Sequence, residues 1–122
     1  MTERSGEPAV DAAAIQQLLD MTGGDPAFLA ELLDAFVEGA VEQLAAMERA
    51  AAAGSAEELI RPAHSLKGNS TNVGAHRLEE LARALEHDAR SGLVDDAAAR
   101  VAAAAAEFEV VKAELATIRG LP

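Results

Sequence analysis

Apolar side chains recur every three or four positions along most of this 122-residue chain. That spacing places them on one face of an α-helix, whereas a half-buried strand would need strict alternation. The residue types agree, because 30 Ala and 14 Leu stand against 8 Val and 3 Ile, and the aromatic residues are three Phe. Strands favour the β-branched and aromatic residues that are scarce here. The sequence therefore predicts an all-α fold and almost excludes an all-β one.

Glycines and helix-capping residues divide the chain into five predicted helices. The helices are expected to begin at Asp11, Asp25, Ser55, the corner at Gly74, and Asp95. Short linkers force neighbouring helices to run antiparallel. We predict one domain over residues 9–120, an antiparallel up-and-down four-helix bundle with a short extra N-terminal helix across one end. Residues 1–8 are predicted to form a flexible tail, and Pro62 to kink the third helix or tighten its first turns.

The same periodicity predicts which face of each helix is buried. For the second helix the predicted stripe is Phe28, Leu32, Phe36, Ala40, Leu44 and Met47. For the fifth it is Ala98, Val101, Ala105, Phe108, Lys112 and Leu115.

The charge balance narrows the possible partners. Ten Lys and Arg against 21 Asp and Glu give a net charge of −11. Nucleic acid and anionic membrane surfaces would repel such a chain. With no cysteine there is no disulfide and no Cys-ligated zinc. The first ten residues are polar and resemble neither a signal peptide nor a membrane span. We expect a cytoplasmic protein, most simply a monomer.

One histidine lies on the outward face of the third predicted helix. On a helical wheel, His64 lies roughly 140° from the centre of the apolar stripe, so its imidazole should point to solvent. Lys67, one turn later, places a cation within reach of any group attached to that ring. Gly68 removes side-chain bulk beside the ring and leaves room for a partner. The alternative is that this glycine only allows close helix packing. Ile60 and Thr71 complete this face as a candidate docking surface, and a stray exposed Ile60 is the plainer alternative.

Glu86 is the predicted neighbour of that histidine on the fourth helix. With the corner at Gly74, residues 64 and 86 lie at similar heights in the antiparallel hairpin. A carboxylate there could accept a hydrogen bond from one ring nitrogen of His64 and leave the other nucleophilic. The alternative is that Glu86 only pairs with Arg90, four residues later on its own helix.

Positive charge is concentrated in this part of the chain. Residues 61–90 hold five cations, including Arg61, and four anions, so their net charge is +1 and the rest of the chain carries −12. Such a distribution suits an anionic modification or an acidic partner. We interpret His76 and His87 as surface residues. A metal site built from His64, Glu86 and His87 lacks any HxxxH or ExxH pairing, so we predict no metal.

The segment from His64 onward resembles the histidine-containing phosphotransfer (HPt) domain of two-component phosphorelays. The HPt signature is roughly H-x-L-K-G, a Gly ten residues after the His, and then a Leu-rich helix. The matching residues are His64, Leu66, Lys67, Gly68, Gly74, Leu78, Leu81 and Leu85. In kinase-associated members a Glu occupies the position of Glu86 and bonds the imidazole. Pro62 departs from the usual pattern.

The resemblance implies a phosphocarrier rather than an enzyme. His64 would carry a phosphoryl group between aspartates of receiver domains in response regulators or hybrid histidine kinases, and Lys67 would offset its charge. The docking surface would comprise Ile60, Arg61, Gly68 and Thr71. No cofactor is expected on this chain, since Mg²⁺ belongs to the receiver. The alternative is a non-catalytic HPt-like interaction or dimerisation module. The polar tail after Met1 favours a stand-alone chain over a piece of a hybrid kinase.

Overall fold

The computed structural model describes residues 8–92 and 95–120, and within them every regular element is a helix. The helices are α1 (Ala12–Met21), α2 (Pro26–Ala52), α3 (Ala56–Asn72), α4 (His76–Arg90) and α5 (Ala97–Ile118). The predicted all-α class and the five helices are confirmed. None of these described helices has the length and apolar character needed to cross a membrane.

The first three helices begin where the sequence places their caps. The side chains of Asp11 and Asp25 accept hydrogen bonds from backbone N–H groups in the following turn, at 2.9 and 3.0 Å. Ser55 Oγ likewise accepts from the N–H of Glu58 at 3.1 Å. These bonds satisfy donors that have no partner inside the helix. At α5 the prediction was wrong by one residue, since the cap position is Asp96 and not Asp95.

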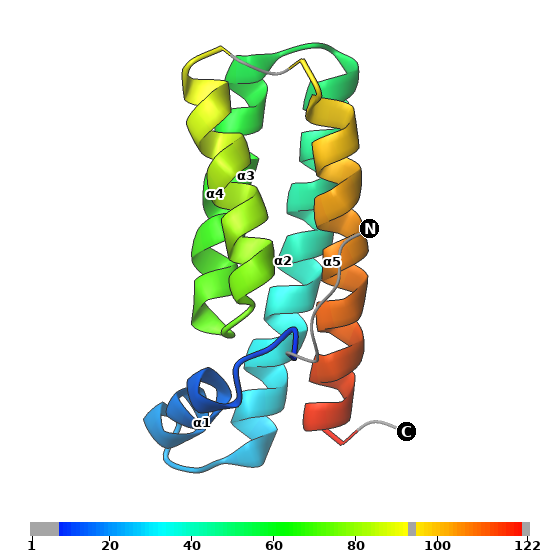
Figure 1. Ribbon diagram of the computed structural model, residues 1–122. Coiled ribbons are helices and arrows are strands. Elements are labelled where there is room, and N and C mark those ends of the chain that lie inside the picture. The colour runs from blue at the N-terminus through cyan, green and yellow to red at the C-terminus, as the bar shows by residue number, and fades with distance from the viewer. Residues whose placement is uncertain (1–7, 93–94, 121–122) are drawn as a thin grey trace.

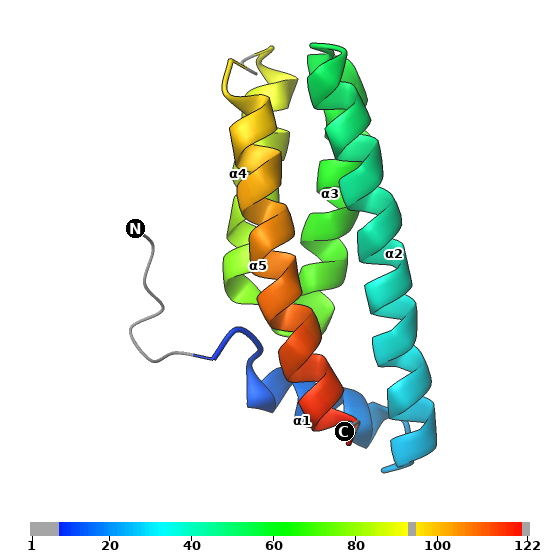
Figure 2. The same cartoon turned by 90° about the vertical axis from the view of Figure 1, so that its right-hand side faces the viewer.

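The four long helices form an antiparallel bundle in which each packs against two others. Helix α2 contacts α3 and α5, and α4 contacts the same two helices. Figures 1 and 2 show that α2 and α5 extend beyond the corner between α3 and α4. The short helix α1 lies beneath that corner, across one end of the bundle. Pro62 lies inside α3 without ending it.

The α3–α4 corner holds the beginning of α1. Gly74 adopts φ +70°, and a Cβ atom there would come within 2.7 Å of the Cβ atoms of both Asp11 and Ala14. The N–H of Asp11 donates to the Gly74 carbonyl at 2.9 Å. Upstream, the N–H groups of Ala9 and Val10 donate to the Glu114 carboxylate of α5. The predicted tail lies outside the described residues except for Pro8.

The predicted buried face of α2 is wrong in its first half. Leu29 and Leu33 are buried, while Phe28 is 48% exposed and Leu32 only partly covered. From Phe36 onward the predicted stripe is correct. In the first half two apolar residues adjoin each other at each turn, so periodicity alone cannot choose between them.

The predicted face of α5 is also partly wrong. Ala98 and Lys112 are exposed, and Ala105 is only partly buried. The buried residues are Ala97, Val101, Ala104, Glu107, Phe108, Val111 and Leu115. This helix is rich in alanine on every side, so its apolar residues define no sharp stripe.

Candidate functional site

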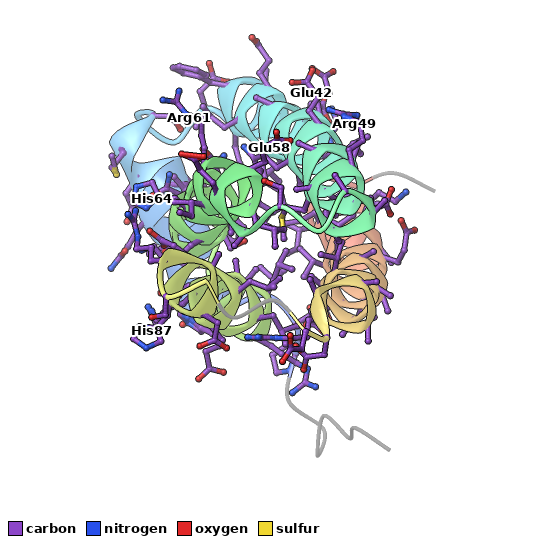
Figure 3. All side chains as sticks on the ribbon, turned by 90° about the horizontal axis from the view of Figure 1, so that it is seen from above. Glu42, Arg49, Glu58, Arg61, His64 and His87 are labelled. Atoms are coloured by element: carbon purple, nitrogen blue, oxygen red, sulfur yellow. The ribbon has the colours of Figure 1, made fainter. Side chains whose placement is uncertain are left out.

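His64 lies on the outer face of α3, and its side chain is 61% exposed. Its neighbours Ala63 and Leu66 are fully buried, because they lie on the opposite side of the helix and pack into the core. Figure 3, a view down the bundle, shows the imidazole on the outside of α3. The ring is therefore accessible to a partner, as the helical wheel predicts.

Glu86 on α4 contacts this imidazole. His64 Nδ1 lies 2.9 Å from Glu86 Oε2, so the antiparallel hairpin brings the two residues together as expected. The Glu86 side chain is only 8% exposed. Because a carboxylate can only accept, Nδ1 carries the proton and donates a hydrogen bond to Oε2. The lone pair then remains on Nε2, which has no protein partner within the described part of the chain.

Glu86 also binds two further cations. Arg90 donates to Oε2 through Nε at 3.1 Å and Nη2 at 2.8 Å. Lys67 Nζ lies 2.7 Å from Oε1, an ion pair that lacks the direction of a good hydrogen bond. Burial alone would raise the pKa of Glu86, but Lys67, Arg90 and His64 lower that pKa to about 2. We call Glu86 with these three residues the Glu86 cluster.

The cluster realises both interpretations that the sequence leaves open for Glu86. One carboxylate oxygen accepts from His64 across the helix pair and from Arg90 along its own helix. The contact with Lys67 is not anticipated by the sequence argument, which leaves that ammonium free for a group on His64. Lys67 lies one helical turn beyond His64, so the same carboxylate can reach both side chains.

The other predicted docking residues surround His64 on α3. Gly68 is exposed, and a Cβ atom there would meet nothing within 4 Å, so this glycine serves no packing need of the chain itself. Thr71 is exposed, and its hydroxyl donates to the carbonyl of Lys67. Arg61 is exposed and has no ion pair among the described residues. Ile60 differs from the expectation, because it is partly buried against the core.

Beyond Thr71 the same face opens into a groove of about 660 Å³ between α1, α2 and α3. Its lining is mainly apolar and includes Leu18, Met21, Leu32, Phe36 and Val73. Sequence reasoning places no docking residue on α1 or α2. The groove depends on how far α1 stands from α3, which helical periodicity does not report. A feature that marks the groove is the exposed apolar side chain of Met21, with 81% of its surface accessible.

The other two histidines lie apart from this site. His76 Nε2 contacts Asp11 Oδ2 at 3.1 Å, and the hydrogen bond to that carboxylate raises the pKa of His76. His76 thus links α4 to the start of α1. His87 is exposed on α4, away from His64, as Figure 3 shows. The described residues contain no group of three side chains placed to hold a metal ion.

Comparison with known proteins gives two matches. The profile of the Hpt domain family matches residues 31–120. The chain is also similar to the crystal structure of histidine-containing phosphotransfer protein B (HptB) from Pseudomonas aeruginosa PAO1, with a TM-score of 0.86 and 32% sequence identity. That similarity covers 93% of this chain and 96% of the other. Among curated proteins, none matches this sequence.

Proposed function

This chain belongs to the Hpt domain family and is a histidine phosphotransfer protein of phosphorelays; from that premise we propose that His64 is the residue that carries the phosphoryl group, between aspartates of receiver domains. The observation that carries this assignment is the hydrogen bond from His64 to the buried Glu86. It holds the proton on Nδ1 and leaves the exposed Nε2 as the nucleophile.

The proposed transfer needs no proton to leave the ring. The Nε2 lone pair attacks the phosphorus of a receiver's aspartyl phosphate, the P–N bond forms, and the P–O bond breaks with its electrons going to the aspartate. The imidazole then carries a positive charge with the proton still on Nδ1. The Glu86 carboxylate, 2.9 Å away, offsets that charge. The step is reversible, because the phosphoramidate can return the group to a second aspartate.

Lys67 Nζ pairs with Glu86 Oε1 at 2.7 Å, and its flexible stem would let the ammonium turn towards phosphoryl oxygens attached to Nε2. Electrostatic stabilisation of the transferred oxygens accounts for most of the catalysis of phosphoryl transfer. The chain itself acts as a carrier without a cofactor, and the Mg²⁺ for the reaction comes with the receiver domain.

The receiver would dock on the α3 face around His64. Gly68 leaves space next to the ring, and the apolar groove beyond Thr71 offers a site for nonpolar side chains of the partner. Arg61, whose side chain is exposed, contributes a cation at the other end of this face. An apolar centre with a charged rim is the usual composition of a protein interface.

The test is phosphoryl transfer from phosphorylated receiver domains to the purified protein. The wild type should take up a label that is lost in acid and kept in base, and His64→Gln should abolish it. Because His64 is exposed, the substitution should leave helicity and melting almost unchanged. His87→Gln, which alters an exposed histidine away from the site, is the matched control and should accept label normally.

Two outcomes would count against the proposal. Label that survives acid would place the phosphoryl group on Ser or Thr. If the wild type never takes label, and both the wild type and His64→Gln bind receivers, the protein is a non-catalytic interaction module.

A further inference from the structure

The two flexible cations of the Glu86 cluster are bound in different ways. Arg90 lies on the same helix as Glu86 and donates two directed hydrogen bonds to Oε2. Lys67 comes from α3 and pairs with the other oxygen through charge and proximity. Its ammonium is a compact point charge on a flexible stem, whereas a guanidinium fork is preorganised. Lys67 is therefore the easier of the two to release.

Phosphorylation of His64 would create a competitor for Lys67. A phosphoryl group brings a charge of about −2 and three strong acceptor oxygens next to the ring. Before transfer, Lys67, Arg90 and Glu86 together carry one positive charge, which complements the negative charge of the modified histidine. The phosphoryl oxygens would draw the Lys67 ammonium away from Glu86.

Releasing Lys67 has a cost that depends on what remains at Glu86. The carboxylate is 8% exposed, and a buried charge left without a partner is strongly destabilising. Arg90 keeps its two bonds to Oε2 whatever Lys67 does, because both of its contacts are to the other oxygen. With Arg90 in place, Glu86 stays ionised and continues to orient the imidazole.

We infer that Arg90 is a positioning residue for phosphotransfer: it holds Glu86 as a paired carboxylate, so that Lys67 is free to move to the phosphoryl group on His64. This inference rests on the proposed function, since it requires His64 to be the phosphorylated residue. It assigns to Arg90 a role beyond the stabilisation of its own helix.

The chain offers a matched control two helical turns before Arg90. Arg83 pairs with Glu79 in the same i,i+4 arrangement on α4, and its side chain has the same 57% exposure as Arg90. Arg83→Gln removes an equivalent helix-stabilising pair without touching the Glu86 cluster. If Arg90 only stabilised α4, the two substitutions would have the same effect.

The experiment measures the equilibrium of label between a receiver and this protein. Arg90→Gln should shift that equilibrium roughly tenfold towards the receiver, the size expected for losing a charged hydrogen bond, and Arg83→Gln should leave it unchanged. Arg90→Lys keeps the charge and should recover most of the loss. In the Lys67→Ala background, Arg90→Gln should have a smaller effect, because the lysine it releases is gone. Circular dichroism confirms that each variant is folded.

The outcomes separate this inference from the proposed function. If wild-type protein never takes label on His64, the proposed function fails and this inference with it. If wild-type protein takes label and the Arg90→Gln equilibrium equals that of wild type or of Arg83→Gln, only the role of Arg90 is overturned. Equal effects of Arg90→Gln with and without Lys67 would also overturn it.

Discussion

The buried carboxylate of Glu86 accepts hydrogen bonds from side chains of two helices, α3 and α4. Its position opposite His64 follows from counting residues to the corner at Gly74, so the sequence predicts the contact. Its burial does not follow from that count, because the exposed fraction depends on how far α3 and α4 rotate towards each other. The sequence offers Arg90 as an alternative partner to His64, whereas in the structure a single carboxylate oxygen, Oε2, accepts from both.

Gly68 lies one turn after His64, where an approaching receiver would need space. We predict that Gly68→Glu blocks transfer from a phosphorylated receiver, since the new side chain would occupy the docking surface and its charge would oppose the phosphoryl oxygens. The bundle should melt at the same or a higher temperature, because glycine in a helix interior costs about 1 kcal/mol relative to alanine. Transfer kinetics and thermal melting measure the two effects.

Gly68→Ala is the control for this variant. A methyl group there meets nothing within 4 Å, so Gly68→Ala should match the thermal gain and retain most of the transfer rate. Wild-type transfer by Gly68→Glu would show that the receiver does not approach this part of α3.

At the scale of elements, the glycine ten residues after His64 holds α1 in place. A side chain at Gly74 would be strained by its φ of +70° and would also collide with Asp11 and Ala14. We predict that Gly74→Ala lowers the free energy of unfolding by at least about 2 kcal/mol, from strain plus displacement of α1. Urea unfolding measures the loss.

Gly54 separates the two causes. It has a similar φ of +66°, but a Cβ atom there meets nothing within 4 Å. Gly54→Ala should therefore cost only the strain of the backbone conformation, about 1 to 2 kcal/mol. Equal losses in the two variants would mean that the contact between α1 and the corner adds nothing to stability.

The helices themselves were predictable because caps, glycines and periodicity all point to the same boundaries. The predicted buried face of a helix is wrong where these signals do not agree. At Phe28–Leu29 and Leu32–Leu33, adjacent apolar residues compete, and contacts with other helices decide which is buried. In α5 the many alanines leave the buried face to tertiary packing. The groove between α1, α2 and α3 is not predicted from the sequence for a related reason, since it depends on the placement of a whole helix.

The whole molecule has a net charge of −11, but cationic side chains are concentrated on the face around His64. His64, Lys67 and Arg90 converge on Glu86. Arg61, one turn before His64, forms no ion pair with any residue that the structure describes. An acidic receiver pocket would be repelled by most of this surface and accepted at this face. The long-range charge would thus favour the docking orientation that brings His64, the proposed phosphorylated residue, to the partner aspartate.

The same cluster links the stability of the bundle to acidic pH. The pKa of Glu86 is lowered from 4.5 to about 2 in the folded protein, so its contribution is fully present above about pH 4.5 and is lost as the pH falls towards 2. Because the Glu86 side chain is largely buried, solvent screens its ion pairs only a little. The ionised carboxylate therefore contributes about 3 kcal/mol to the free energy of unfolding. The raised pKa of His76 acts in the opposite sense, but its contribution is lost only as the pH rises above 6.5.

We therefore predict that the free energy of unfolding falls more steeply between pH 5 and pH 2 in the wild type than in Glu86→Gln. The variant starts lower at pH 5, because its neutral amide no longer pairs with Lys67 and Arg90. The difference between the two proteins should shrink as Glu86 takes up its proton. Asp11 also titrates in this range with a lowered pKa, but its 43% exposed side chain is screened and is the same in both proteins. Urea unfolding at half-unit pH steps measures both curves, and parallel curves would show that Glu86 keeps its ordinary pKa in the folded bundle.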